Sequence, residues 1–288
     1  MVRLTILISA LACLASCKLG KAPVAVSSSD APPKRIVSLD YCADQFVLKF
    51  ADKASIRAVS PDAVRQFSYM RDAAVGLPSV RPNAEDVLLL QPDLVVRSYG
   101  GGPNAGAFFE KAGVPVLQVG FASDMESIKS VIRDMSAGLG DAAAGEATIL
   151  EMDRRLASIP KYQNPPEALY MTPSGVTSGT GTQVDEMLQA AGLGNFQKLP
   201  GWRSIPLERL AYEQPDVVAA AFFETLTNHP DAWSAMKHPV AKRQMRDLPT
   251  VPLQGAWTSC GSWFLLDAIE ALSDFENASA LGEQGKRP

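Results

Sequence analysis

Glu85-Asp-Val-Leu-Leu-Leu-Gln-Pro-Asp-Leu-Val-Val96 returns later in the chain as Glu208-Arg-Leu-Ala-Tyr-Glu-Gln-Pro-Asp-Val-Val-Ala219. In both copies a glutamate stands six residues before Gln-Pro-Asp, and the offset between the copies is constant at 123 residues (208 − 85 and 214 − 91). A repeat of this length is longer than the roughly 20–50-residue unit of a solenoid. It predicts two similar lobes with a cleft between them, an arrangement that favours a binding protein.

Each copy has the composition of a short helix followed by a strand. Asn83 is placed to cap a helix over 85–90, whose first-turn acids interact favourably with the helix dipole. The proline that follows Gln91 disfavours the α region for that residue, so the helix ends there. Leu94–Val96 is an unbroken apolar run, as expected for a parallel strand covered on both faces. The second copy predicts the same two elements.

The N-terminus has the pattern of a secretory signal. Arg3 precedes the short apolar stretch 4–16, and about 20 residues are needed to span a bilayer, so the stretch is too short for a transmembrane helix. Leu14-Ala-Ser-Cys17 is typical of a bacterial lipobox, in which Cys17 becomes the lipidated first residue; an ordinary signal cleaved nearby is the alternative. We assign 1–17 to the signal peptide with its lipobox and 18–34 to a flexible tether.

Composition restricts the partners. The 288-residue chain has a formal net charge of −4 and no basic run, which argues against nucleic acid. Of its four cysteines, Cys13 leaves with the signal and Cys17 would carry lipid. Cys42 and Cys260 remain, and in an oxidising periplasm we expect them to form a disulfide. Two buried thiols or two soft metal ligands are the alternatives.

The rest of the chain alternates between strand-like and helix-like segments, which indicates an α/β fold. We predict two Rossmann-like lobes with central parallel sheets, at 35–122 and 160–282, joined by one long helix over 123–159. The predicted strands are 35–39, 56–59, 94–96, 114–119, 168–171, 217–221 and 250–253. The other predicted helices are 42–50, 85–90, 104–112, 183–191 and 262–272.

Several segments resemble the periplasmic binding proteins of cobalamin and ferric-siderophore ABC importers. They are Arg35–Leu39, Asp44–Leu48, Ala58–Ser60, Asn83–Val96 and Gly113–Val116, and the likeness extends over nearly all of 35–275. The resemblance implies a monomeric protein of the bacterial periplasm, which lipid on Cys17 would anchor to the membrane. It would hold a metal chelate between two lobes joined by one long helix and deliver it to a membrane permease with its ATPase. Haem or another hydrophobic cargo is the alternative.

The same resemblance implies a docking role for the repeated glutamates. In that family a glutamate on each lobe forms salt bridges with arginines of the permease, and Glu85 and Glu208 stand at the matching positions. Such pairs would mainly fix orientation and speed encounter. The alternative is that each glutamate is only a favourable first-turn helix residue.

Ligand sites in open α/β sheets lie on the turns after the carboxyl ends of the strands. The candidates on these turns and neighbouring segments are mostly aromatic, with two arginines, a composition that suits a large flat or greasy chelate. They are Tyr41, Cys42, Tyr69, Arg71, Tyr99, Trp202, Arg203, Phe222, Trp257, Cys260 and Trp263. Each aromatic could instead pack in a core or between the lobes. A disulfide between Cys42 and Cys260 would join the two cleft turns.

Catalytic patterns are weak throughout the sequence. The only histidines, His229 and His238, each precede a proline, and neither belongs to a zinc-binding pattern. Gly175-Val-Thr-Ser-Gly179 has Thr where a nucleophile elbow requires Ser. We therefore expect a binding protein that is not an enzyme, with no metal site and no cofactor besides lipid on Cys17. A cell-envelope enzyme or an adhesive lipoprotein on the same scaffold is the alternative.

Overall fold

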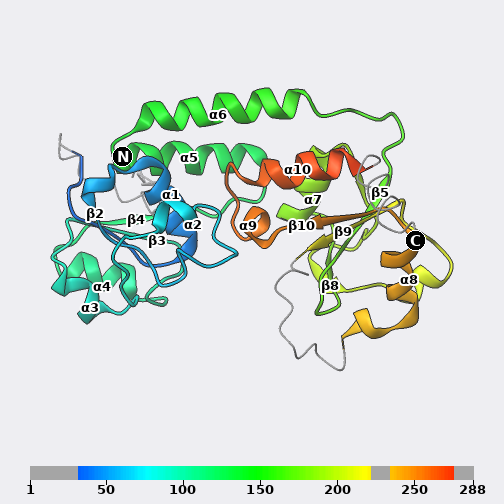
Figure 1. The fold of residues 1–288 in the computed structure, drawn as a ribbon, viewed down its shortest axis with the longest axis horizontal. Helices are drawn as coiled ribbons and strands as arrows, with labels where there is room; N and C mark the ends of the chain where they lie inside the picture. The colour runs from blue at the N-terminus through cyan, green and yellow to red at the C-terminus, as the bar shows by residue number, and fades with distance from the viewer. Residues whose placement is uncertain (1–31, 222–233, 276–288) are drawn as a thin grey trace, which may run out of the picture.

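The computed structural model describes residues 32–221 and 234–275, which form two α/β lobes (Figure 1). The first lobe contains a parallel sheet with the strand order β2-β1-β3-β4. Its strands are β1 (Ile36–Ser38), β2 (Ile56–Ala58), β3 (Leu94–Arg97) and β4 (Val116–Gln118). Every residue of β1 and β3 is buried, as expected for central strands covered on both faces.

Short helices connect these strands. They are α1 (Tyr41–Phe50), η1 (Lys53–Ser55), α2 (Arg71–Ala74), α3 (Ala84–Leu89) and α4 (Ala105–Lys111). The predicted cap of α3 is confirmed, because the Asn83 side chain accepts a hydrogen bond from the N–H of Asp86. The chain then turns at Gln91, whose φ of 47° is the only positive value at a non-glycine residue within the described ranges. The helix therefore ends just before the proline, as predicted.

The segment 123–159 forms two helices, so the prediction of a single long helix was wrong. α5 (Met125–Leu139) ends at Gly140, whose φ of 91° lies in the left-handed region that favours glycine. α6 (Ala142–Ala157) follows at once and packs back along α5, where Lys129 pairs with Asp153 at 2.6 Å. In Figure 1, α6 leads the chain from the first lobe towards the second.

The second lobe repeats the architecture of the first. Its parallel sheet has the order β10-β9-β5-β7. The strands are β5 (Glu167–Met171), β7 (Gly194–Asn195), β9 (Val217–Ala221) and β10 (Thr250–Leu253), and β6 (Val176–Ser178) with β8 (Trp202–Ser204) forms a separate antiparallel pair. The helices are α7 (Gln183–Ala190), η2 (Arg209–Ala211), η4 (Ala235–Lys237), α8 (Pro239–Asp247), α9 (Gly255–Thr258) and α10 (Leu265–Ser273). The predicted α/β fold with two parallel sheets is confirmed.

The aspartate of the repeat has the same structural role in both lobes. The N–H of Asp93 donates to the carbonyl of Arg35 at 3.0 Å, and its carboxylate accepts from the N–H of Arg35 at 2.8 Å. Asp216 makes the equivalent pair of bonds with Glu167, at 2.8 and 2.7 Å. Each aspartate thus joins the start of its own strand to the start of the neighbouring central strand.

The two copies differ in their helical half. Glu85 lies in the first turn of α3, whereas Glu208 precedes η2, a single 3-10 turn. The prediction that the second copy would also form an α-helix was therefore wrong. Tertiary contacts hold the shorter turn: the guanidinium of Arg209 lies 3.9 Å from the centre of the Phe196 ring and donates to Glu213 at 2.7 Å.

One continuous apolar core runs through both lobes. It includes Ile36 and Phe46 from the first lobe, Ile132 from α5, and Tyr170 and Ile269 from the second lobe. Each of these side chains is almost fully buried. A shared core opposes free movement of the lobes, because separating them would expose apolar surface.

Several predictions fall outside the described residues. These are the signal peptide 1–17 with Cys17, the tether up to residue 31, Phe222, His229 and the chain beyond 275. The last part of the expected tether belongs to the fold, since the N–H of Lys34 donates to the Asp93 carboxylate at 3.1 Å. Across 32–221 and 234–275, the helices are too short or too polar to cross a membrane.

Candidate functional site

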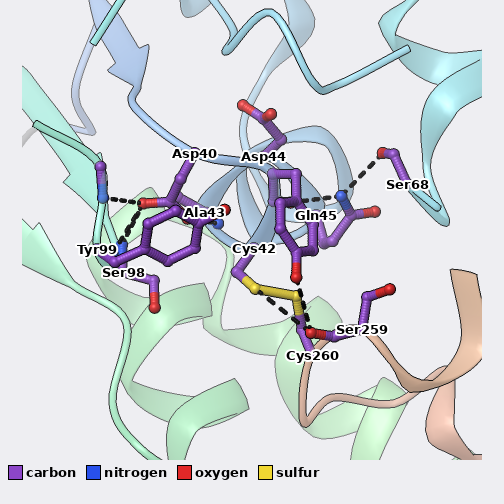
Figure 2. The surroundings of a disulfide bond; sticks show 12 residues. Asp40, Cys42, Ala43, Asp44, Gln45, Ser68, Ser98, Tyr99, Ser259 and Cys260 are labelled. Atoms are coloured by element: carbon purple, nitrogen blue, oxygen red, sulfur yellow. Dashed lines mark hydrogen bonds between the residues drawn. A yellow bond between two sulfur atoms is a disulfide. The ribbon is translucent and has the colours of Figure 1, made fainter. Parts of the chain in front are cut away.

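The start of α1 reaches across to the second lobe. The hydroxyl of Tyr41 donates to the carbonyl of Ser259 at 3.0 Å, and Cys42 forms a disulfide with Cys260 (Figure 2). The two cysteines are 218 residues apart in sequence, with their Cα atoms 5.9 Å apart. The predicted disulfide is therefore present, which sets aside the alternatives of two thiols or two metal ligands.

Further aromatic packing joins the lobes beside the disulfide. The Trp263 ring of the second lobe meets Phe46 and Phe50 of α1 edge-on, at centroid distances of 5.5 and 5.6 Å. Tyr69 of the first lobe stacks on Phe264 at 4.8 Å. We call this contact, between 41–50 with Tyr69 and 259–267, the interlobe seam. It contains five predicted ligand residues, Tyr41, Cys42, Tyr69, Cys260 and Trp263, whose contacts hold the lobes together.

A polar network continues the interlobe seam to α6. The hydroxyl of Tyr69 donates to Asp267 at 2.9 Å, and burial followed by this bond raises the pKa of Tyr69 to about 12. Arg155 of α6 donates to Asp267 at 2.7 Å and to Glu270 at 2.6 and 2.7 Å. These bonds hold the pKa of Glu270 below its usual range. The network ties the connecting helix to both lobes.

Asp40 positions the turn after β3. One carboxylate oxygen accepts from the backbone N–H groups of Ser98, Tyr99 and Gly100 at 2.7, 3.1 and 2.8 Å, and the other caps α1 through Ala43 N–H at 3.0 Å (Figure 2). The turn requires glycine at 100, because a Cβ there would lie 2.4 Å from the carbonyl oxygen of Leu39. Tyr99 is thereby held with 53% of its surface exposed.

Arg97 supports the same turn from the other side. Its guanidinium donates to the carbonyls of Gly100 and Gly102 at 2.9 and 2.8 Å, and to the Gln118 side chain at 3.0 Å. The side chain is buried. The sequence reasoning missed Arg97 because it lies within the apolar pattern of β3, where a buried arginine is not expected.

Tyr41 and Tyr99 form an aromatic group with Phe67. The Tyr41 ring meets Phe67 and Tyr99 edge-on, at 5.1 and 6.0 Å between ring centres. Burial, then the charge of Asp40, raises the pKa of Tyr41, and burial followed by interaction with Tyr41 raises that of Tyr99. Both phenols therefore keep their protons at neutral pH. Phe67 was missed, although it follows β2 in the chain as the other candidates follow their strands.

Phe121 is a second missed aromatic. It lies on the connection after β4, at the same sheet edge as Tyr99, and is 92% exposed. This connection leads to Met125, whose N–H donates to Glu186 of the second lobe at 3.2 Å. The strand-end rule that selected Tyr99 would also have selected Phe121.

The remaining predicted residues within the described ranges lie outside the interlobe seam. Trp202 on β8 is 60% exposed and meets Tyr170 edge-on at 6.0 Å. Arg203 is exposed and donates to the Pro200 carbonyl at 3.1 Å. Arg71 and Trp257 are half-buried. The structure thus separates exposed candidates from those in the interlobe seam.

A cavity of about 560 Å³ lies at a different place. It is lined by the end of α1, the turn between α5 and α6, and Pro32–Lys34. None of the predicted ligand residues lines it. We therefore build the candidate site from the exposed aromatics and not from this cavity.

Metal-binding groups are not gathered in the described parts of the chain. Over residues 32–221 and 234–275, no cluster of three or more His, Cys, Asp or Glu side chains is arranged to hold an ion. His238 instead caps α8, with its Nδ1 accepting from the N–H of Val240 at 3.2 Å.

Comparison with known proteins identifies the family. The family model described as "Periplasmic binding protein" matches residues 36–238. A cobalamin-binding protein of Halobacterium salinarum is 26% identical over 200 residues, covering 66% of this chain and 54% of the relative. The chain thus spans about half the length of that relative.

Solved structures of similar fold agree with this family. A periplasmic heme-binding protein from Pseudomonas aeruginosa is 27% identical, with a TM-score of 0.66 over 84% of this chain and 92% of that one. The periplasmic heme-binding protein BhuT, solved with two hemes, is 25% identical, with a TM-score of 0.65 over 86% and 99%. The match over most of the chain, together with the two-lobed fold, makes this chain a member of the periplasmic binding protein family.

Proposed function

We propose that this chain binds a metal chelate between its lobes and delivers it to the permease of an ABC importer. The observation that carries the proposal is a set of exposed aromatic side chains outside the interlobe seam. Tyr99, Phe121 and Trp202 are 53%, 92% and 60% exposed. Here two of them stand on strand-end turns, where this fold class binds ligands.

The composition of the site favours a flat metal macrocycle, either a corrinoid or a haem. Aromatic faces suit the apolar faces of such a ring, and Arg71 and Arg203 suit its carboxylate or amide edges. Relatives at similar identity are named for cobalamin and for heme. A ferric siderophore is the second candidate, because the arginines and the protonated Tyr99 phenol also suit an anionic chelate.

Delivery would use the two glutamates of the repeat. Glu85 and Glu208 are both exposed, one on each lobe. An acid on each lobe can pair with a cation on each half of a two-part permease and so fix the orientation of docking. In this proposal, lipid on Cys17 would anchor the protein to the membrane and keep it near the permease.

Thermal unfolding in the presence of ligand tests the proposal. Binding to the native state stabilises it by RT ln(1 + [L]/Kd), so the correct chelate raises the Tm. The mature protein would be heated with cyanocobalamin, haemin, a ferric hydroxamate and a ferric catecholate. We expect a shift with one class, and no shift with any of the four would overturn the proposal.

Matched variants locate the bound chelate. Trp202→Ala and Tyr99→Ala should reduce the shift, because each removes an exposed aromatic face. Tyr162→Ala is the control, since Tyr162 is also exposed but packs near Gly192, away from the strand-end turns. Equal shifts in all three variants would place the ligand elsewhere.

A further inference from the structure

The repeat places a second exposed residue one turn after each glutamate. Leu89 follows Glu85 by four residues and Tyr212 follows Glu208 by four, so the pair keeps the 123-residue offset (212 − 89). Leu89 is 82% exposed and Tyr212 is 92% exposed. On the α-helical turn of α3, residues four apart lie on the same face, whereas Glu208 and Tyr212 flank the 3-10 turn of η2. Each lobe therefore presents an exposed acid and a large exposed apolar side chain four residues apart.

Among the described residues, Glu85 and Glu208 have no cationic partner. The acids near them in the repeat do have one. Asp86, next to Glu85, pairs with Arg81 at 2.9 Å. Glu213, near Glu208, pairs with Arg209 at 2.7 Å. No ion pair involves Glu85 or Glu208 among residues 32–221 and 234–275.

A local structural role explains these acids poorly. The cap of α3 is Asn83, and Glu208 makes no capping hydrogen bond although it stands at the cap position of η2. The two elements also differ, one an α-helix and the other a 3-10 turn. The sequences nevertheless keep an acid and an apolar residue at the same spacing on two different backbones. A requirement outside the chain accounts for this better than one within it.

We infer that each lobe docks through a two-part contact, with Glu85 and Leu89 on one side and Glu208 and Tyr212 on the other. The partner is a protein with two matching sites, and each site has a cation beside an apolar recess. This inference rests on the proposed delivery to a permease and adds an apolar component to it. The acid steers encounter in a salt-dependent way, whereas the apolar side chain supplies close-range affinity that salt weakens little.

Binding to the permease–ATPase complex that takes up the chelate, reconstituted in nanodiscs, tests the inference. The full-length mature protein would be compared with three variants. Two are single variants, Leu89→Ser and Tyr212→Ser, and the third is the double variant Glu85→Gln, Glu208→Gln. Val75→Ser and Leu150→Ser are the controls, because these residues are also exposed, at 67% and 69%, but lie outside the repeat. We expect each repeat serine variant to weaken binding about tenfold at both low and high salt, which corresponds to about 1.4 kcal/mol.

The outcomes separate the inference from the function it rests on. The glutamine variant should weaken binding mainly at low salt, and both controls should bind like the parent. If Leu89→Ser and Tyr212→Ser match the controls while the glutamine variant is impaired, docking through the acids stands and the apolar contact is refuted. If the parent protein does not bind the complex at all, the proposed delivery itself fails. Chelate-induced thermal shifts, measured on each variant, should be unchanged.

Discussion

At the scale of single residues, Asp40 shows how one carboxylate can position a site. It accepts backbone hydrogen bonds at the start of α1 and in the turn that carries Tyr99. The side chain is 3% exposed, so a donor left without it would be buried and unsatisfied. In the proposed function, Tyr99 can face a ligand only if this turn is held in place.

Asp40→Asn should therefore destabilise the protein more than the loss of one helix cap. The amide can accept at one of the two oxygen positions but not at both, and we expect a loss of about 2 kcal/mol or more in urea unfolding. Asp124→Asn is the control, because Asp124 caps α5 while exposed to solvent, and should cost about 1 kcal/mol or less. Equal losses would contradict the role given to Asp40.

Asp44 gives a pH-dependent prediction. Burial raises its pKa from 3.8 to about 6, although Ser38 and Ser60 donate hydrogen bonds to it. The folded state binds the proton more tightly than the unfolded state, so the carboxyl's contribution to stability is complete below about pH 3.8 and is lost as the pH rises through about 6. The free energy of unfolding of the parent, measured relative to Asp44→Asn, should fall over this range. A constant difference would refute the raised pKa.

At the scale of elements, the sequence predicted the strands well because their signals are local. The apolar runs at 94–96 and 217–221 became β3 and β9, and the end of α3 followed from the proline after Gln91. The break at Gly140 was missed, because an isolated glycine within a helical pattern is tolerated and does not by itself end the helix. The β6–β8 pair was missed because it joins segments distant in sequence.

The candidate site was less predictable than the fold. Trp202 lies in a connecting segment and Trp263 at the start of a predicted helix, and neither local sequence shows whether the ring is buried. Their roles differ because the placement of the lobes buries Trp263 against α1 and leaves Trp202 exposed. No local sequence pattern predicts how the two lobes are placed relative to each other. Phe121, by contrast, followed a recognised strand and could have been found.

Alanine substitutions at these two tryptophans should differ in their effect on the free energy of unfolding. Trp263→Ala removes a buried ring at the interlobe seam and should cost about 3–5 kcal/mol in unfolding free energy. Trp202→Ala should cost less than about 1 kcal/mol, because surface substitutions rarely cost more. Denaturant unfolding of both variants checks this. A stable Trp263→Ala protein would show that the seam contributes little to the fold.

At the scale of the whole molecule, the Cys42–Cys260 disulfide and the shared core join the lobes. A cross-link between residues 218 apart restricts the unfolded chain strongly, and loss of such a native bond typically costs about 2–5 kcal/mol. The Cys42→Ser, Cys260→Ser double variant should unfold at lower temperature than the parent. A reductant should lower the Tm of the parent towards that of the variant and leave the variant unchanged. Equal Tm values for the oxidised parent and the variant would contradict this stabilising role.

In the proposed function, the two lobes together bind a flat metal macrocycle through exposed aromatic side chains. Calorimetric titration of the mature protein with cyanocobalamin, and separately with haemin, tests it most directly, with Tyr99→Ala and Trp202→Ala taken from opposite lobes and Tyr162→Ala as control. We expect saturable binding of one of the two ligands, with weaker binding in both lobe variants and parental affinity in the control. Absence of saturable binding, or binding that is insensitive to both Tyr99 and Trp202, would contradict it.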